Sequence, residues 1–217
     1  MQKSLNSIGM AQSKSSRWGD LSGKLGPMVM FVRYGKQYAR THTIPRDPKT
    51  PAQLAQRAKL SLVNKCLAPL SQVIKQNFKE GYIAYRSLVG DTIKYFVVGE
   101  YPDFSIDYSR IPISEGKVLL PERISAVYHS DSNQVTFTWD AQLPPPSIWS
   151  NANDPVKILF LHAPTLSVFK PSGIVKRSHG RVSVELPGEW NSPGIHCWVY
   201  LTSWDLQHRS DSQYVNI

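Results

Sequence analysis

The sequence predicts an α+β protein in which an N-terminal β-hairpin and helices are followed by a C-terminal β-sandwich. Three observations favour this fold class. A clearly specified helix start lies at residues 50–53, a hairpin pattern precedes it, and short β-patterned segments separated by turn residues fill the chain from residue 119 onward. The chain has 217 residues, which suits one large domain or two small ones.

The predicted boundaries divide the chain into three parts. Residues 1–20 are rich in Ser, Gln and Lys, and we expect them to form a flexible polar arm. Residues 21–110 are predicted to form a basic hairpin–helix module. Residues 111–217 are predicted to form the β-sandwich domain.

The first structured segment that the sequence predicts is the hairpin. Met28–Arg33 and Tyr38–Thr43 have high β-propensity, and residues 34–37 supply the turn. Basic and aromatic residues alternate around its tip, namely Phe31, Arg33, Tyr34, Lys36, Tyr38 and Arg40. Such a mixture binds single-stranded nucleic acid by phosphate contact and base stacking. It also arises from cation–π packing on an edge hairpin, and the sequence leaves both interpretations open.

The helix that follows has a well-defined start. Thr50 is placed to cap it, Pro51 suits the first helical position, and Gln53 can reach back to the cap, which together make a capping box. The cap alone is worth about 1 kcal/mol. Apolar residues then recur at helical spacing, at Leu54, Ala58 and Leu62 and at Leu60, Val63 and Leu67. Pro69 is expected to kink or restart this helix.

A second helical pattern covers Tyr82–Phe96, where apolar residues repeat at three and four positions. Gly99–Asp103 reads as a turn, and Phe104–Tyr108 alternates as a short strand. This segment links the helices to the predicted sandwich.

The predicted sandwich strands lie at residues 124–128, 134–139, 156–161, 166–169, 181–186, 195–204 and 213–217. Val156–Leu161 is nearly all apolar, which is typical of a central strand. Ile195–Trp204 alternates so that Cys197 and Trp198 point to opposite faces. About seven short strands with regular turns resemble the fibronectin type III or immunoglobulin class, although the Cys…Trp…Cys pattern of antibody domains is missing.

Positive charge is concentrated in the first third of the chain. Residues 1–80 contain 14 Lys or Arg and 3 acidic residues, a net of +11, whereas residues 81–217 carry a net of −2. A basic segment attracts nucleic acid, acidic lipid or an acidic protein surface. Surface charge that serves solubility explains the excess equally well.

No catalytic or metal-binding motif is recognisable. The six histidines are His42, His129, His162, His179, His196 and His208, and none has a metal-ligand spacing. Residues 19–25 resemble a phosphate-binding loop, but three residues separate its glycines where four are required. The sequence therefore predicts no enzyme, cofactor, metal site or small-molecule substrate.

Cysteine usage and hydropathy indicate where the chain resides. Cys66 and Cys197 are expected to be two buried free thiols. No secretory signal peptide is visible at the N-terminus, and no run approaches the roughly 20 apolar residues of a membrane helix. We expect a cytoplasmic or particle-associated protein.

The order of these features resembles an uncharacterised family, a domain of unknown function common in Bacteroidota. The residues that carry the resemblance are Gly23–Val29, Gly35-Lys36, Arg40, Thr50–Ala55, Tyr101–Phe104, Ile106–Ser109 and Ser210–Tyr214. The resemblance implies a fold but no activity. The hairpin–helix element also resembles short phage-encoded proteins, which implies a role in assembly.

Two functions follow from these features. The first is a non-enzymatic structural or interaction protein that docks through its basic N-terminal module within a larger assembly, phage-like or homo-oligomeric, with a protein partner or a second copy. The alternative is a nucleic-acid-binding protein that uses the same segment. The residues expected to bind the partner or an anion are Lys24, Arg33, Tyr34, Lys36, Arg40, Arg46, Lys49 and Arg57, with Lys59 added for a nucleic acid.

Overall fold

The computed structural model describes residues 10–13, 21–44, 47–142, 148–188, 190 and 194–217. The chain divides into two compact units, Met1–Lys49 and Thr50–Ile217. Both strands and helices are present, which confirms the α+β class.

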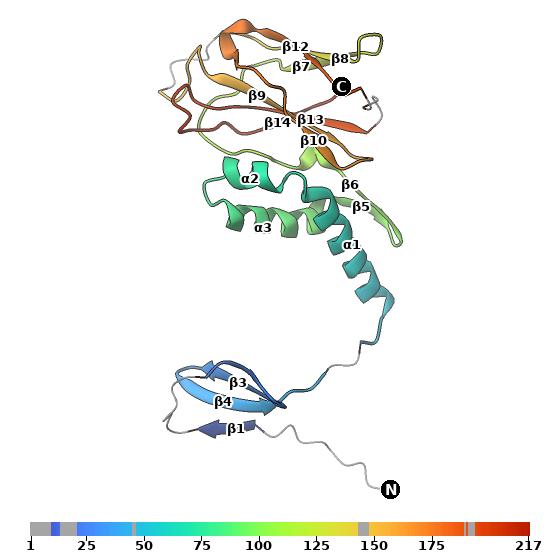
Figure 1. Ribbon diagram of the computed structural model, residues 1–217, viewed down its shortest axis with the longest axis vertical. Coiled ribbons are helices and arrows are strands. Elements are labelled where there is room, and N and C mark those ends of the chain that lie inside the picture. The colour runs from blue at the N-terminus through green and yellow to red at the C-terminus, as the bar shows by residue number, and fades with distance from the viewer. Residues whose placement is uncertain (1–9, 14–20, 45–46, 143–147, 189, 191–193) are drawn as a thin grey trace. The chain divides into compact units, whose positions relative to one another are not determined.

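The first unit is a four-stranded antiparallel sheet with the order β1-β4-β3-β2 (Figure 1). Its strands are β1 (Met10–Ser13), β2 (Gly23–Leu25), β3 (Met28–Arg33) and β4 (Lys36–Thr41). The expectation of a flexible arm is wrong for residues 10–13, because they pair with β4 over four positions. Pairing along a sheet edge uses backbone N–H and C=O groups, so it needs no apolar pattern in the sequence. The rest of the predicted arm lies outside the described residues.

The predicted hairpin is confirmed with a shorter turn. Only Tyr34 and Gly35 connect β3 to β4, with φ angles of 52° and 67°, and Arg33 pairs directly with Lys36. Two central residues with positive φ match the right-handed twist of the flanking strands. Lys36 and Gln37 therefore begin β4 instead of completing the turn.

The second unit begins with α1 (Pro51–Leu67), and its start confirms the capping box. The Gln53 N–H donates to Thr50 Oγ1 at 3.4 Å, and the Thr50 N–H donates to Gln53 Oε1 at 3.3 Å. The chain restarts after Pro69 as α2 (Ser71–Asn77), as expected. The burial differs in one respect: Val63, Cys66 and Leu67 are buried, whereas Leu60 is 46% exposed. Only the C-terminal part of α1 reaches a core.

The second predicted helical segment forms α3 (Tyr82–Asp91) and continues as the π-helical turn η1 (Thr92–Phe96). A hairpin then follows, made of β5 (Val97–Glu100) and β6 (Asp103–Ile106). The sequence assigns Gly99 and Glu100 to a turn, but they pair with Phe104 and Asp103. A short 3₁₀ turn, η2 (Tyr108–Arg110), leads to the remaining strands.

The remaining strands form two antiparallel sheets. The first has the order β12-β8-β7, and the second has the order β10-β9-β13-β14, with β11 also pairing with β9. Their bounds are β7 (Ser125–His129), β8 (Gln134–Thr138), β9 (Pro155–His162), β10 (Ser167–Phe169), β11 (Val175–Lys176), β12 (Arg181–Glu185), β13 (Ile195–Leu201) and β14 (Gln213–Val215). A 3₁₀ turn, η3 (Arg177–His179), joins β11 to β12. All seven predicted strand positions of residues 111–217 carry a strand, and among the described strands of these two sheets β11 is the one that the sequence does not predict.

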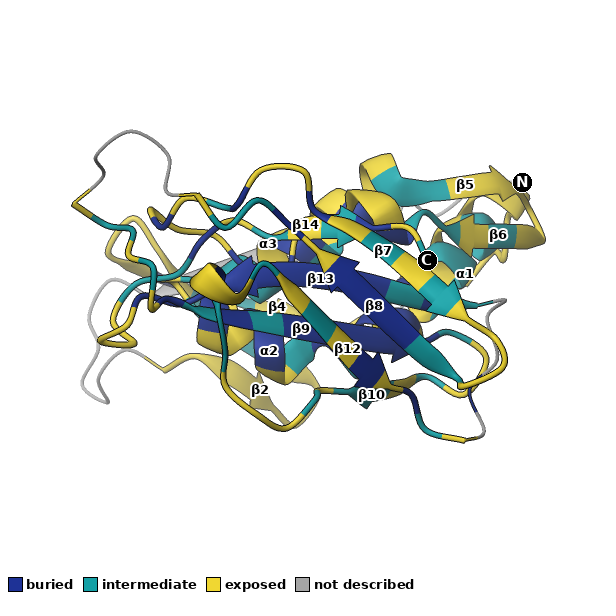
Figure 2. Ribbon diagram, turned by 90° about the horizontal axis from the view of Figure 1, so that it is seen from above, coloured by how far each residue is buried: buried dark blue, intermediate teal, exposed yellow. Residues whose placement is uncertain are grey.

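One core lies between these two sheets. Phe137 of β8 meets Phe160 of β9 edge to face at 5.8 Å, and both are fully buried. Cys197 and Val199 of β13 fill the same layer. In Figure 2, β8, β9 and β13 are therefore the most continuously buried strands of the second unit.

A second core lies between the helices and the other face of the larger sheet. Trp198 of β13 is fully buried there with Leu67 and Ile74, and its Nε1–H donates to the Ile111 carbonyl at 2.9 Å. The helices therefore share a core with β9 and β13 (Figure 1). The structure groups residues 50–110 with residues 111–217, whereas the sequence suggests a boundary between residues 110 and 111.

Candidate functional site

The pairing register places four predicted cations on one face of the N-terminal sheet. Residues directly opposite each other in an antiparallel pair point to the same face, and successive residues point to opposite faces. Lys24 lies opposite Val29, and Val29 lies opposite Arg40. Four positions along β3 and β4, Arg33 lies opposite Lys36 at the tip. We call this surface the basic face, and it contains Lys24, Val29, Phe31, Arg33, Lys36, Tyr38 and Arg40.

An aromatic pair occupies the middle of the basic face. Phe31 and Tyr38 are cross-strand partners whose rings stack with centroids 5.6 Å apart and planes 18° apart. Both side chains are half-buried. Lys24 and Arg40 flank this pair on one side, and the cations of the tip flank it on the other. The arrangement offers a flat aromatic surface between positive charges, which suits a polyanion that carries planar groups.

The tip of the hairpin carries an unfavourable charge pair. Arg33 and Lys36 lie directly opposite each other, and like charges in that position destabilise a sheet by roughly 0.2–1 kcal/mol. The Arg33 guanidinium lies 5.2 Å from the ring of Tyr34, a side chain that is 86% exposed. This contact supports the cation–π interpretation for Arg33. Lys36 and Arg40 are also exposed, and their charges are accessible to a bound anion.

The opposite side of the sheet is apolar, and we call it the apolar face. It contains Leu25, Met28, Met30, Val32, Gln37 and Ala39. Leu25 is 65% exposed and Val32 is 39% exposed. Among the described side chains of this unit, in residues 21–44 and 47–49, only Gln37 is buried, and its Nε2 donates to the Leu21 carbonyl at 2.9 Å. The described part of this sheet therefore has no apolar core of its own.

The other predicted site residues are not part of β2, β3 or β4. Lys49 ends the first unit, with a φ of 48° and its N–H donating to Asp47 Oδ1 at 3.2 Å. Arg46 lies outside the described residues. Arg57 is an exposed residue of α1 in the second unit. Lys59 packs over the Phe104 ring at 4.9 Å, so it has a structural contact within that unit.

Ionisable side chains also gather where α1, η2, β13 and β14 meet. The rings of Tyr108 and His196 lie 4.2 Å apart, and His196 Nδ1 lies 2.9 Å from Tyr214 Oη. Burial lowers the pKa of His196, and the charge of Asp107 offsets part of that change. Burial also raises the pKa of Tyr108, as does its hydrogen bond with Cys66. Burial therefore disfavours the charged forms of His196 and Tyr108 at neutral pH, and both rings are structural residues that pack against neighbouring elements.

The Ser-Asp-Ser motif near the C-terminus is structural as well. Ser210 Oγ accepts from the Leu201 N–H at 2.7 Å, and Ser212 Oγ accepts from the Ile113 N–H at 2.9 Å. Asp211 Oδ1 accepts from the Gly116 N–H at 3.1 Å. The motif therefore fixes residues 113–116 against the C-terminal strands. Sequence analysis could not assign this role, since the partners lie 9 to 99 residues away in the chain.

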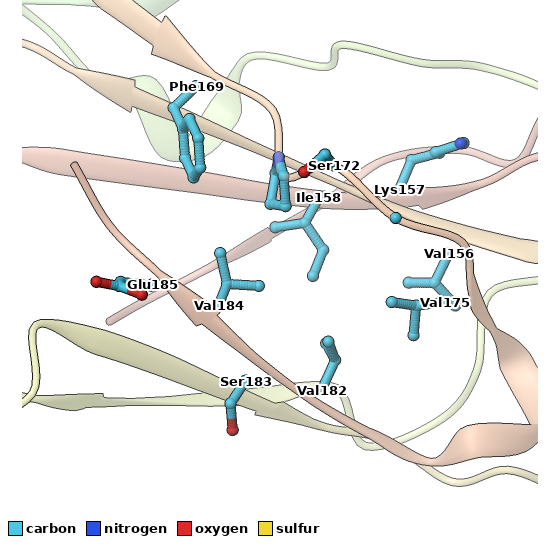
Figure 3. A pocket seen from close by; sticks show the side chains of 12 residues that line it. Val156, Lys157, Ile158, Phe169, Ser172, Val175, Val182, Ser183, Val184 and Glu185 are labelled. Carbon is cyan, nitrogen blue, oxygen red and sulfur yellow. The ribbon is translucent and has the colours of Figure 1, made fainter.

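A pocket of about 250 Å³ opens between the edges of the two sheets in the second unit. Figure 3 shows Ile158, Val182 and Val184 around it, with Phe169 at one side. Lys157 and Glu185 also line the pocket. The lining is mainly aliphatic and offers no nucleophile with an adjacent base. In the part of the chain that the structure describes, no group of three or more His, Cys, Asp or Glu side chains is placed to hold a metal ion.

Both cysteines are free thiols and buried, as the sequence predicts. Burial raises the pKa of Cys197 well above its usual value, so this thiol is unreactive at neutral pH.

Among the described residues, no helix is both long enough and apolar enough to span a membrane.

Comparison with protein families gives one match. Residues 16–216 match the sequence model of DUF6266, a family of unknown function. The resemblance to an uncharacterised family is therefore confirmed for almost the whole chain. Searches of curated proteins and of solved structures found no match to this chain.

Proposed function

The chain belongs to DUF6266, a family of unknown function, and we propose that it is a non-enzymatic interaction protein that docks through its N-terminal sheet within a larger assembly. The observation that supports this function is the accessibility of both faces of that sheet. A few strands gain stability mainly by covering an apolar face. An accessible apolar face that adjoins charged residues is typical of a surface that binds another protein.

The two faces offer different chemistry to a partner. Leu25, Met28 and Val32 present aliphatic side chains on the apolar face, which suits burial against protein. Lys24 and Arg40 present charge on the basic face, which suits an acidic partner. We assign the apolar face to contact with a protein neighbour, including a second copy of this chain.

Residues 50–217 serve as the scaffold in this proposal. Their two cores lie on opposite faces of one sheet, so the strands of that sheet are covered on both sides. We infer that the two sheets form a sandwich of the fibronectin type III or immunoglobulin class, a fold that commonly serves binding. The proposed setting is cytoplasmic or particle-associated.

Light scattering of the full chain tests the proposal. We expect the mass to rise with concentration, or a partner to co-purify in a pull-down. Met28→Lys on the apolar face should abolish the association. Arg40→Gln is the matched control, because Arg40 lies opposite Val29, the neighbour of Met28, and points to the other face. A chain that stays monomeric at high concentration and captures no partner contradicts the proposal.

A specific observation favours a second candidate function, which is binding of single-stranded nucleic acid by the basic face. The stacked rings of Phe31 and Tyr38 lie between two groups of cations. Base–aromatic stacking contributes about 1–3 kcal/mol per base, and flanking cations contact the phosphates. Duplex DNA does not expose its base faces, so we expect a preference for single strands.

Anisotropy titrations with labelled single- and double-stranded oligonucleotides test this candidate across a salt series. Four cations that each neutralise one phosphate give a slope of about −2.8 in log K against log salt, or roughly a fifty-fold loss between 50 and 200 mM. Arg40→Gln should reduce the slope by about 0.7. Lys170→Gln, an exposed cation of the second unit, is the control. Absence of binding at low salt excludes the candidate.

A further inference from the structure

A small pocket lined by aromatic and polar side chains lies in the second unit, and it shares no residue with the basic face. Its volume is about 140 Å³, and its walls come from residues 148–151, residues 203–205 and His208. Trp149, Asn151, Trp204, Asp205 and His208 supply the groups that a ligand would meet. Trp204 is 67% exposed, which is unusual for so large an apolar side chain in a rigid loop.

Hydrogen bonds hold the loop that presents Trp204. The Ser203 N–H donates to the His208 carbonyl at 2.9 Å, and the His208 N–H donates to Ser203 Oγ at 2.9 Å. The Leu206 N–H donates to the Ser203 carbonyl at 2.8 Å, in a turn where Leu206 has a φ of 63°. The indole is therefore exposed on an ordered turn, and its binding would require little ordering of the loop.

A buried carboxylate joins the two walls of the pocket. Asp154 is fully buried, and its two oxygens accept from the backbone N–H groups of Asn151 at 2.6 Å and Trp204 at 3.0 Å. Arg177, also fully buried, interacts electrostatically with this carboxylate. Burying such charges costs free energy. Because Asp154 binds the backbone of both segments that line the pocket, it fixes the spacing between them. Asp154 is therefore a positioning residue.

The polar groups of the pocket favour an uncharged, hydroxyl-rich ligand. Asp205 Oδ1 accepts from Ser203 Oγ and from the Gln207 N–H, and these bonds lower the pKa of Asp205. The carboxylate is therefore ionised at neutral pH and disfavours an anion. A quaternary ammonium ion binds best between several open aromatic faces, whereas here Trp204 offers one and Lys117 Nζ lies 4.9 Å from the Trp149 ring.

We propose that this pocket binds one ring of a neutral carbohydrate, with the apolar face of the sugar on the Trp204 indole and its hydroxyls on Asp205 and Asn151. The site combines an aromatic surface with a few convergent polar groups, as small-molecule sites do. It departs from the sequence-based expectation of no small-molecule ligand. It is independent of the proposed docking function, because it uses other residues.

Nuclear magnetic resonance of the ¹⁵N-labelled full chain tests the site. The indole N–H signal of Trp204 is identified by its loss in Trp204→Ala. Methyl α-glucoside, methyl β-galactoside and N-acetylglucosamine are titrated separately, with choline chloride and inorganic phosphate as further probes. We expect a saturable shift of this signal with at least one of the sugars and none with choline or phosphate.

Variants complete the test, and their sugar binding is followed by the backbone amide signal of Asn151, because the Trp204 variants lack the indole N–H. Trp204→Ala should weaken sugar binding at least roughly tenfold, Trp204→Phe should retain part of it, and Asp205→Asn should weaken it several-fold. Tyr95→Ala is the matched control, since Tyr95 is 50% exposed and lies outside the pocket. The proposal is overturned if no sugar shifts the Trp204 signal saturably, if choline or phosphate shifts it instead, or if Tyr95→Ala weakens binding as much as Trp204→Ala.

Discussion

The N-terminal sheet and the sheets of residues 50–217 are built from the same kind of antiparallel strand, yet they bury their side chains to opposite extents. Of the side chains described in the first unit, only Gln37 is buried. In the second unit, β9 and β13 are covered on both faces, with Phe160 and Cys197 on one side and Leu159 and Trp198 on the other. A sheet covered on both faces buries the apolar side chains that stabilise it. A single-layer sheet leaves its apolar side chains accessible to a partner. This difference in burial is the reason for proposing the first unit as the docking element and the second as the scaffold.

The largest expected effect is on the helix-covered core. Trp198→Ala should lower the free energy of unfolding of the second unit by about 3–5 kcal/mol, because it removes a fully buried indole and leaves the Ile111 carbonyl without its donor. Urea unfolding followed by circular dichroism measures it. Phe31→Ala, in the N-terminal sheet, is the control and should leave that transition unchanged. Equal destabilisation by the two variants would contradict the division into two units.

The pH dependence of stability offers a second comparison. Burial lowers the pKa of His196 in the folded chain, so the unfolded chain, with a pKa near 6.5, binds the proton more readily. Stability from this group is fully present above about pH 6.5, and it is lost as the pH falls toward the folded-state pKa. Unfolding measured across that range should show the decline. His196→Gln should flatten it, whereas His129→Gln, at an exposed position, should not.

A smaller effect is expected at the start of α1. Thr50→Ala removes an acceptor for the Gln53 N–H and should cost about 1 kcal/mol. Because the first turns of α1 are largely exposed, the loss should appear as faster hydrogen exchange near Leu54. Thr50→Ser keeps the hydroxyl and is the control. If Ser and Ala have the same effect, the cap does not stabilise this helix.

The smallest expected effect concerns the tip of the basic face. Lys36→Glu replaces the like-charged pair with Arg33 by an opposite-charged one and should stabilise the hairpin by roughly 0.2–1 kcal/mol. Slower hydrogen exchange of the β3 and β4 amides would show it. Lys36→Gln should give an intermediate result. Unchanged exchange in both variants would mean that repulsion between Arg33 and Lys36 does not destabilise the hairpin. One reason to expect a bound anion at the tip would then be removed.

Much of the local structure follows from residue pattern alone. Thr50 and Gln53 specify the helix start, and the apolar run Val156–Leu161 marks a strand buried on both faces. The alternation of Cys197 and Trp198 correctly places them in different layers. The cations of the candidate site are equally visible in the sequence. The convergence of Lys24 with the hairpin cations depends on the pairing of β2 with β3, and the predicted strands Met28–Arg33 and Tyr38–Thr43 do not include β2.

By itself, the sequence determined the features that depend on neighbours within a few residues: the capping box, the break at Pro69, the alternation of the strands and the early excess of positive charge. Only the tertiary structure decided which segments meet. It grouped the helices with β9 and β13, paired residues 10–13 with β4, and brought residues 151 and 204 together on Asp154. The physical reason is that long-range pairing depends on backbone hydrogen bonds and on the burial of complementary surfaces. A local pattern shows that a segment is buried, but it does not show which distant segment covers it.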